Sequence, residues 1–251
     1  MGKTTTAINL GASLAANDLR VLVIDSDPQG NTTTGLGVQK EEGTLTLYDA
    51  LLGQQELAAT VAATGFEGLD LVPADKNLIG ANIELVDIPE REFRLRERLK
   101  TLRDKYDFVL IDCPPALDLL TLNALLAADS VLVPIQCEFF ALEGVSELMD
   151  TIDRIRDGFG HPLRIQGILL TMYDERTNLT RQVAKDLREF FGSDVLRTII
   201  PRSVRLAEAP SYGKPILVYD VRSRAAESYI QLAKEILENE QALRQPTQGT
   251  R

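Results

Sequence analysis

The sequence predicts an α/β fold in which a mostly parallel sheet is flanked by helices. Strand-like and helix-like segments alternate along the chain, which is typical of βαβ units. Two apolar strand-like segments end in aspartate, at Asp25 and Asp112. Near the start of the chain, Gly2, Lys3 and Thr4 match the last three positions of the phosphate-binding pattern G-x-x-x-x-G-K-[ST]. These observations favour a nucleotide-binding domain of the P-loop type.

The first predicted helix covers residues 3–16, where Ile8 and Leu14 are among the apolar positions. A buried strand follows at 19–25, because an apolar run leads directly into Asp25. The remaining elements alternate in the same way. The predicted strands are 19–25, 69–72, 107–112, 130–135, 164–171, 195–200 and a short 215–218. The predicted helices are 3–16, 117–128, 142–157, 177–191 and 224–243, and residues 76–104 are expected to be helical with a break near Pro89.

Chemistry-bearing side chains follow two of these strands. Asp25 and Asp27 come at the end of one apolar strand, and Asp112 ends another. Because the carboxyl ends of parallel strands meet at one edge of a sheet, we expect these groups to lie near the start of the first helix. A lone carboxylate on an apolar strand is costly unless it is paired or near a metal, so Asp112 is a candidate metal ligand.

A single domain is expected over residues 1–243, since 251 residues can bury a sizeable core and no linker or repeat divides them. Residues 244–251 form a polar tail that we expect to be frayed. Hydrophobic residues make up 44% and charged residues 25%, as in an ordinary globular protein. The apolar runs have strand length and residues 1–16 lack a signal-peptide pattern, so we expect a cytoplasmic protein that does not span a membrane.

The two cysteines, Cys113 and Cys137, form no C-x-x-C pair and match no metal spacing, which favours reduced thiols in or near the core. The single histidine, His161, lies between glycine and proline, where a turn residue is expected. The net charge of −10 argues against general coating of nucleic acid. Residues 176–224, however, hold ten Lys and Arg against five Asp and Glu, a local charge of +5. This segment predicts salt-sensitive contact with a phosphate backbone; scattered solvated arginines are the alternative.

Four ordered segments closely resemble the ParA/Soj type of chromosome- and plasmid-partitioning ATPases, which share a deviant P-loop with MinD. The segments are residues 2–10, 23–31, 110–115 and 201–216. The resemblance covers the chain to about Leu243. It implies an enzyme that uses ATP and Mg²⁺, dimerises on ATP, binds DNA non-specifically and is stimulated to hydrolyse ATP by a ParB-type centromere-binding partner. A nucleoid-associated location in the cytoplasm follows from the same resemblance.

The resemblance also implies roles for individual residues. Lys3 and Asp27 would be catalytic, with Lys3 on the β- and γ-phosphates and Asp27 on the attacking water. Thr4 and Asp112 would hold Mg²⁺. The expected nucleotide-binding residues are Gly2, Lys3, Thr4, Thr5, Met172, Pro201 and Arg202, the last three in loops that contact adenine. The candidate DNA-binding residues are Arg197, Arg202, Arg205, Lys214, Arg222 and Arg224, because an arginine fork suits phosphate. Residues 31–37 are expected to act as a mobile switch.

The family's loop reads Lys-Gly-Gly-Val-Gly-Lys-Thr-Thr, whereas this sequence begins with Met1 in place of the valine. We therefore expect the first strand and the start of the P-loop to be absent from this chain. Both neighbouring strands would lose ladder hydrogen bonds, and nucleotide binding and hydrolysis by this chain would be impaired. A GTG valine codon taken as the gene start is our hypothesis for this difference.

Two other functions remain open on the sequence alone. A MinD-like membrane-associated ATPase would end in a basic amphipathic helix, which residues 238–246 do not resemble. A catalytically decayed interaction paralogue is favoured by the missing Lys-Gly-Gly, and is opposed by the presence of both Asp27 and Asp112. The sequence does not distinguish a chromosome system from a plasmid system.

Overall fold

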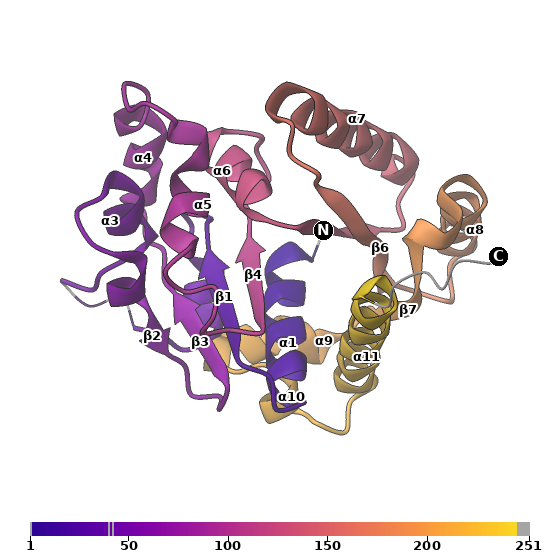
Figure 1. Cartoon of the computed structure of the whole chain (residues 1–251). Coiled ribbons are helices and arrows are strands. Elements are labelled where there is room, and N and C mark those ends of the chain that lie inside the picture. The colour runs from indigo at the N-terminus through magenta and orange to yellow at the C-terminus, as the bar shows by residue number, and fades with distance from the viewer. Residues whose placement is uncertain (1, 40, 42, 245–251) are drawn as a thin grey trace.

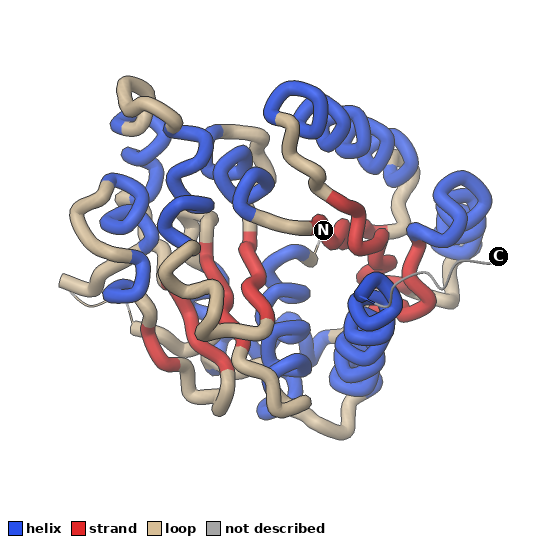
Figure 2. Tube along the Cα trace, viewed as in Figure 1, coloured by secondary structure: helices blue, strands red, loops and turns tan. Residues whose placement is uncertain are grey.

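The computed structural model describes residues 2–39, 41 and 43–244. Its strands form two sheets (Figure 2). The four-stranded sheet has the order β2-β3-β1-β4, with β1 (Val21–Asp25), β2 (Ala62–Ala63), β3 (Leu69–Val72) and β4 (Phe108–Asp112). The three-stranded sheet has the order β5-β6-β7, with β5 (Ser130–Gln136), β6 (Arg164–Tyr173) and β7 (Val195–Pro201). All pairs are parallel except β2 with β3, and no ladder joins β4 to β5 among the described residues.

Helices cover both sheets (Figure 1). The α-helices are α1 (Lys3–Ala15), α2 (Asn31–Gly35), α3 (Leu47–Leu52), α4 (Leu78–Glu84), α5 (Arg94–Leu99), α6 (Leu119–Ala127), α7 (Ala141–Phe159), α8 (Asn178–Phe191), α9 (Val204–Glu208), α10 (Ile216–Tyr219) and α11 (Arg224–Arg244). The 3₁₀ turns are η1 (Leu57–Thr60), η2 (Arg91–Phe93), η3 (Gly192–Asp194) and η4 (Ala209–Tyr212). The α/β fold with mostly parallel sheets is therefore confirmed. No helix in the described part of the chain is long and apolar enough to cross a bilayer.

The strand predicted at 215–218 is wrong, because this segment forms the one-turn helix α10. Pro215 precedes the turn, and its carbonyl accepts hydrogen bonds from the N–H groups of Val218 and Tyr219, both at 3.0 Å. The apolar residues of this segment suit a strand by composition. No strand among the described residues pairs with this segment, and turn hydrogen bonds engage its backbone instead. The short β2, α2, α3 and α9 were not predicted.

Helices α1 and α11 join the two sheets into one core. Figure 1 shows α1 running between β4 and α11. The shared cluster holds Ile8 and Leu14 from α1, Val21 and Leu69 from the first sheet, Leu169 and Leu196 from the second, and Tyr229, Leu232, Ala233 and Ile236 from α11. These four α11 residues recur at helical spacing, so one apolar face of α11 is buried against the rest of the domain.

The carboxyl ends of β1 and β4 lie at the edge of the first sheet where α1 begins. Asp25 and Asp112 are register partners in the β1–β4 ladder, so their backbones are adjacent. The start of α1 also approaches the end of β6, since a Cβ added at Gly2 would lie 3.4 Å from Oγ1 of Thr171. This arrangement gathers groups from α1, β1 and β4 at one place, as the sequence predicted.

Candidate nucleotide-binding site

The start of α1 is shaped for an anion. Gly2 precedes the helix with a φ of 83°, which favours glycine, and no side chain caps the helix. Lys3, Thr4 and Thr5 form the first turn, where the helix itself cannot pair the backbone N–H groups. Such N–H groups attract phosphate. The Lys3 ammonium donates a hydrogen bond to the carbonyl of Pro114 at 3.1 Å, so it lies beside the loop that follows β4.

Asp112 is the most informative side chain of the site. Its Oδ2 accepts hydrogen bonds from the hydroxyls of Thr4, at 2.8 Å, and Thr32, at 2.6 Å. Its Oδ1 is buried and has no hydrogen-bond partner among the described residues. Burial raises the pKa of Asp112, and the hydrogen bonds from Thr32 and Thr4 oppose this shift. A buried carboxylate oxygen without a partner calls for a compensating charge.

The donor set fits Mg²⁺. Among the described residues, no three His, Cys, Asp or Glu side chains gather as a complete metal cage. Mg²⁺ in nucleotide enzymes is usually bound by one or two protein oxygens, with phosphate and water completing the octahedron. The Asp112 carboxylate and the Thr4 hydroxyl, which are already in contact with each other, are hard oxygen donors of this kind.

Asp27 lies close to this pair. It is half-buried in a turn at the end of β1, where its Oδ1 accepts a hydrogen bond from the N–H of Gln29 at 2.9 Å. Its charge contributes to raising the pKa of Asp112, while the charge of Lys3 opposes that shift. The structure thus brings together Lys3, Thr4, Asp27 and Asp112, the four residues predicted to carry the phosphate and metal chemistry.

Asp25 is more deeply buried than Asp27 and supports it from below the site surface. It is fully buried, with 0% exposure. Its Oδ2 accepts hydrogen bonds from the N–H and hydroxyl of Thr33, at 2.8 and 2.7 Å, and its Oδ1 accepts one from the N–H of Asp27 at 3.2 Å. Burial raises the pKa of Asp25 to about 6 against the lowering effect of the Thr33 hydrogen bonds. With both of its oxygens engaged, Asp25 holds the backbone of Asp27 and the start of α2.

Sequence reasoning missed Thr32 and Thr33 as site residues. Both are fully buried in α2, within the segment that was expected to be a mobile switch, and each donates its hydroxyl hydrogen to a different aspartate. The run of threonines directly after Asp27 was the available signal, because short hydroxyl side chains suit contact with carboxylates.

The three residues predicted to contact adenine lie together on the second sheet. Tyr173, which follows Met172, pairs with Pro201 in the β6–β7 ladder, and its carbonyl accepts a hydrogen bond from the N–H of Arg202 at 3.0 Å. Met172 is half-exposed and has a φ of 49°, an uncommon value for a residue with a side chain. Strained positions of this kind are concentrated at ligand sites.

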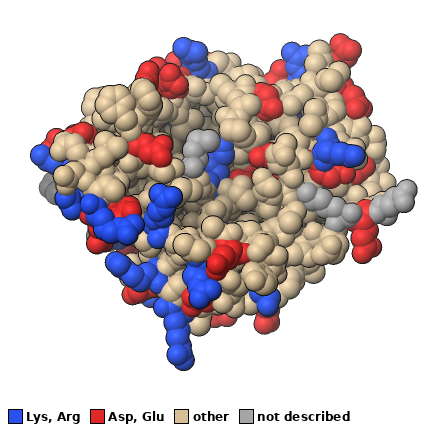
Figure 3. Space-filling model, turned by 180° about the vertical axis from the view of Figure 1, so that it is seen from behind, with Lys and Arg blue, Asp and Glu red and all other residues tan. Residues whose placement is uncertain are grey.

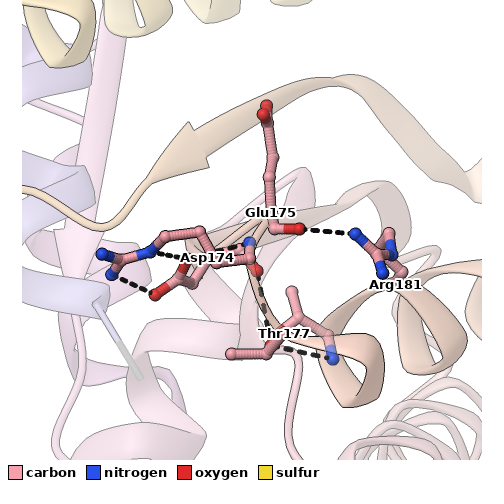
Figure 4. Close-up of polar contacts among 6 residues, drawn as sticks. Asp174, Glu175, Thr177 and Arg181 are labelled. Carbon is pink, nitrogen blue, oxygen red and sulfur yellow. Dashed lines mark hydrogen bonds and ion pairs between the residues drawn. The ribbon is translucent and has the colours of Figure 1, made fainter.

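The turn that follows Met172 is held by side-chain hydrogen bonds. Asp174 accepts bonds from Nε and Nη2 of Arg176, at 2.8 and 2.7 Å, and these bonds lower its pKa, with a smaller contribution from the charge of Arg202. Arg181 donates a hydrogen bond to the main-chain oxygen of Glu175, at 2.8 Å (Figure 4). In the same view, the Glu175 carboxylate points away from Asp174, Thr177 and Arg181. That carboxylate lies 3.8 Å from Arg224 at the start of α11.

The candidate DNA-binding residues differ in how far they are already paired. Arg197 contacts Glu235 and Glu238, at 3.3 and 2.8 Å. Arg205 contacts Glu208 and Asp220, at 3.2 and 3.6 Å. Exposed Arg202, Lys214 and Arg222 form no side-chain ion pair within the described part of the chain. In Figure 3, Lys and Arg gather toward the lower left of the rear face, on the side where Figure 1 places α11, with acidic side chains among them.

The remaining sequence expectations concern isolated residues. Cys113 and Cys137 are both free thiols. Burial raises the pKa of Cys113 to about 12 and that of Cys137 to about 11, which makes both weak nucleophiles at neutral pH. A ring nitrogen of His161 is hydrogen-bonded to the carbonyl of Ala128 at 2.8 Å, so this residue ties a turn to the end of α6.

A hollow of about 510 Å³ lies between α4, η2, α6 and α7, and Asp25, Asp27 and Asp112 are not among the residues that line it. Val86, Asp118 and Phe159 are among the residues that line it, and none of Lys3, Thr4, Asp27 or Asp112 does. We assign the chemistry to the sheet edge beside α1, because the unpartnered oxygen of Asp112 and the uncapped helix are found there.

Comparison with known proteins agrees with this geometry. Residues 1–165 match a family described as an AAA domain. The chain is 52% identical over 242 residues to the chromosome partitioning protein ParA of Caulobacter vibrioides, covering 96% of this chain and 91% of the relative. It is 50% identical over 239 residues to the sporulation initiation inhibitor protein Soj of Bacillus subtilis, covering 95% and 94%.

Among solved structures, cobyrinic acid a,c-diamide synthase from Mycobacterium smegmatis, with bound ADP and magnesium, superposes with a TM-score of 0.84 at 35% identity. That match covers 100% of this chain and 94% of the other. The identity to ParA and to Soj over nearly their full lengths is decisive. The chain belongs to the ParA/Soj family of chromosome-partitioning ATPases.

Proposed function

We propose that this protein hydrolyses ATP to segregate DNA. It binds ATP with Mg²⁺, dimerises when ATP is bound, holds DNA without sequence preference and hydrolyses ATP faster when a ParB-type partner engages it. The observation that carries the proposal is the cluster of Lys3, Thr4, Asp27 and Asp112 at one sheet edge, with an unpartnered oxygen on Asp112. The bound ADP and magnesium of the Mycobacterium smegmatis relative support the choice of ligands.

Each side chain of the cluster has a role that its position supports. Thr4 and Asp112 hold the metal, which neutralises phosphate charge when bound. Lys3 leaves the Pro114 carbonyl for the phosphates, since an ammonium carries three donors and gains more from an anion than from a carbonyl. Asp27 orients the attacking water, and Asp25 holds the backbone of Asp27 in place.

In this proposal, the adenine of ATP and the DNA each bind to another part of the molecule. Met172, Pro201 and Arg202 form the wall against adenine, which the adjacent ends of β6 and β7 support. DNA contacts the basic segment 176–224, with salt-sensitive affinity because its phosphates release counterions. Lys214 and Arg222 are the strongest candidates there, since both are exposed and form no ion pair with a described residue.

A membrane-associated function has less support. A membrane-binding helix must keep an apolar face free. The apolar face of α11 is buried in the core through Tyr229, Leu232 and Ile236. Partition of the protein onto anionic vesicles, with affinity comparable to its DNA affinity, would favour the membrane function instead.

The first experiment measures ATP turnover of the 251-residue chain and of a form extended upstream by its in-frame codons. Each form is assayed alone, with DNA, and with DNA plus a ParB-type partner. Turnover that rises with DNA and partner supports the proposal, and restriction of turnover to the extended form supports a mis-assigned start. Failure of both forms to hydrolyse ATP would favour a catalytically decayed paralogue and would remove the roles given to Lys3 and Asp27.

A further inference from the structure

Helix α2 connects the nucleotide edge to the basic segment around Lys214. At one end of the helix, Thr32 donates to Asp112 and Thr33 donates to Asp25. Beyond its other end, Gly37 lies against the backbone of Gly213, the residue before Lys214. A change at the carboxylates can therefore reach Lys214 through a single short helix.

The contact between the two glycines is direct and leaves no room for a side chain. A Cβ added at Gly213 would lie 2.6 Å from Cα of Gly37, and a Cβ added at Gly37 would lie 3.0 Å from the carbonyl oxygen of Gly213. Both residues have a left-handed backbone, with φ of 76° and 63°. Two backbones in contact transmit a displacement with little loss, because no flexible side chain lies between them.

The body of α2 is also closely fitted. A Cβ at Gly35 would lie 2.5 Å from Cδ1 of Ile8 in α1, and 3.5 Å from Cβ of Pro210 in η4. The helix is therefore confined between α1 and η4, so a shift of its first turn moves the whole helix against Gly213.

A second attachment lies on the other side of Lys214. Asn9 of α1 is buried, and its Oδ1 accepts a hydrogen bond from the N–H of Ile216 at 2.7 Å. Its Nδ2 donates to the carbonyl of Thr5 at 2.7 Å, in the first turn of the same helix. Lys214 thus lies between Gly213 and Ile216, each held by an element that reaches the nucleotide edge.

We propose that α2 is a relay through which nucleotide at Asp112 sets the DNA affinity of the segment around Lys214. The inference rests on the proposed function, and it adds the route by which one site controls the other. A metal on the free Oδ1 of Asp112 would draw on the same carboxylate that anchors the Thr32 hydroxyl through Oδ2, so filling the site would change the hydrogen bond that holds the first turn of α2. Coupling of this kind is reciprocal, so DNA raises the affinity for nucleotide by the same factor.

The test is Gly37→Ala, with Gly43→Ala as its matched control. Gly43 is also left-handed, with φ of 86°, but a Cβ there would meet nothing within 4 Å, so it reproduces the backbone strain alone. A second pair is Gly213→Ala with Gly160→Ala, which has φ of 60° and the same open surroundings. The measured quantity is the ratio of DNA dissociation constants without and with ATP and Mg²⁺, on a duplex of arbitrary sequence, in the form of the protein that hydrolyses ATP.

In the wild type we expect this ratio to be about 5–150, the usual range of allosteric coupling. Gly37→Ala and Gly213→Ala bring it to within about threefold of one while ATP affinity changes little, and both controls keep the wild-type ratio. A wild-type ratio retained in Gly37→Ala and Gly213→Ala overturns the relay. A wild type with no nucleotide-dependent DNA binding contradicts the proposed function itself, so the two failures are distinguishable.

If the glycine variants do not fold, as judged by circular dichroism and thermal melting, the other end of α2 provides the test. Thr32→Val removes the hydroxyl that contacts Asp112, and Thr32→Ser restores it without changing Gly37 or Gly213. We expect the ratio to fall in Thr32→Val and to recover in Thr32→Ser. An unchanged ratio in Thr32→Val would overturn the relay.

Discussion

At the scale of single residues, one carboxylate oxygen determines the character of the site. Oδ2 of Asp112 accepts two hydroxyl hydrogen bonds from α1 and α2, whereas its Oδ1 accepts none from a described residue. The imbalance fits a ligand better than it fits a structural role, because buried structural carboxylates usually have both oxygens paired. Asp25 provides the comparison, since both of its oxygens are engaged.

Replacement of Asp27 tests whether this residue acts in ATP hydrolysis rather than in ATP binding. We expect Asp27→Ala to lower the rate of ATP hydrolysis by about 10²–10⁴-fold, the usual contribution of a positioned acid or base, with ATP affinity within severalfold of the wild type. Asp150→Ala, on the exposed side of α7, is the control and retains full activity. Single-turnover hydrolysis and equilibrium binding of a nucleotide analogue measure the two quantities. Equal losses in both would mean that Asp27 acts in binding.

Titration of Asp25 should make the free energy of unfolding fall as pH rises. Its pKa is raised from 3.8 to about 6 by burial, so the folded state holds the proton more tightly than the unfolded state. Stability from this group is therefore lost as pH rises from about 4 to about 6. The loss is about 3 kcal/mol, at about 1.4 kcal/mol for each pKa unit.

Urea unfolding of the wild type and of Asp25→Asn, without nucleotide or metal, measures this effect. The amide does not titrate, so the difference in unfolding free energy between the two proteins should change by about 3 kcal/mol between pH 3 and pH 7 in favour of the variant. A constant difference across this range would show that Asp25 keeps an ordinary pKa.

At the scale of elements, the exposed edge of β7 is protected by α11. Glu235 is buried, and it accepts hydrogen bonds from the N–H groups of Arg197 and Thr198, at 2.8 and 2.9 Å. Edge strands need such protection because their unpaired backbone groups invite other strands. Burial tends to raise the pKa of Glu235, but the hydrogen bonds outweigh it and the pKa lies below the ordinary value.

Loss of the Glu235 side chain should therefore be costly. We expect Glu235→Ala to lower the free energy of unfolding by about 2–6 kcal/mol, since two strand N–H groups lose their partner at about 1–3 kcal/mol each. The control is Glu238→Ala one helical turn later, which removes only an exposed contact with Arg197. We expect that change to be below about 1 kcal/mol. Equal melting temperatures for the two variants would contradict this account.

The elements show where sequence reasoning succeeds and where it stops. The ends of β1 and β4 were predicted correctly, because buried parallel strands are continuous apolar runs that stop at a polar residue. Residues 215–218 were misread, because the same apolar composition suits a single helical turn when no strand lies alongside. The hydroxyl contacts of Thr32 and the pairing of Arg197 with Glu235 depend on segments that are distant in sequence, and a local pattern holds no information about them.

At the scale of the whole molecule, charge is divided unevenly. The net charge is −10, and the segment 176–224 carries +5. Part of that net positive charge is offset by carboxylates outside the segment, because Arg197 lies within 4 Å of Glu235 and Glu238, and Arg224 lies within 4 Å of Glu175. The surface available to a phosphate backbone is therefore smaller than the composition suggests.

The ion pairs allow us to rank the candidate DNA-binding residues, because a side chain that is already paired has less to gain from a phosphate. We expect Lys214→Ala and Arg222→Ala each to weaken DNA binding severalfold and to reduce the slope of log affinity against log salt by about one. Arg197→Ala serves as the comparison, and we expect a smaller change, since its guanidinium is held by Glu235 and Glu238. Titrations at several salt concentrations provide the measurement. A larger loss in Arg197→Ala than in Lys214→Ala would reverse this ranking.

The packing of α1 against α11 has a consequence for synthesis on the ribosome. Thr6 and Tyr229 lie 223 residues apart in sequence, yet their hydroxyls are 3.4 Å apart in the core. At about 5–20 residues per second, the first helix waits roughly 10–45 seconds for the last one to emerge. During that time the part of α1 that packs against α11 lacks its final cover, although the first sheet can already pack on the rest of the helix. The core between α1 and α11 can therefore close only after the final helix has left the exit tunnel.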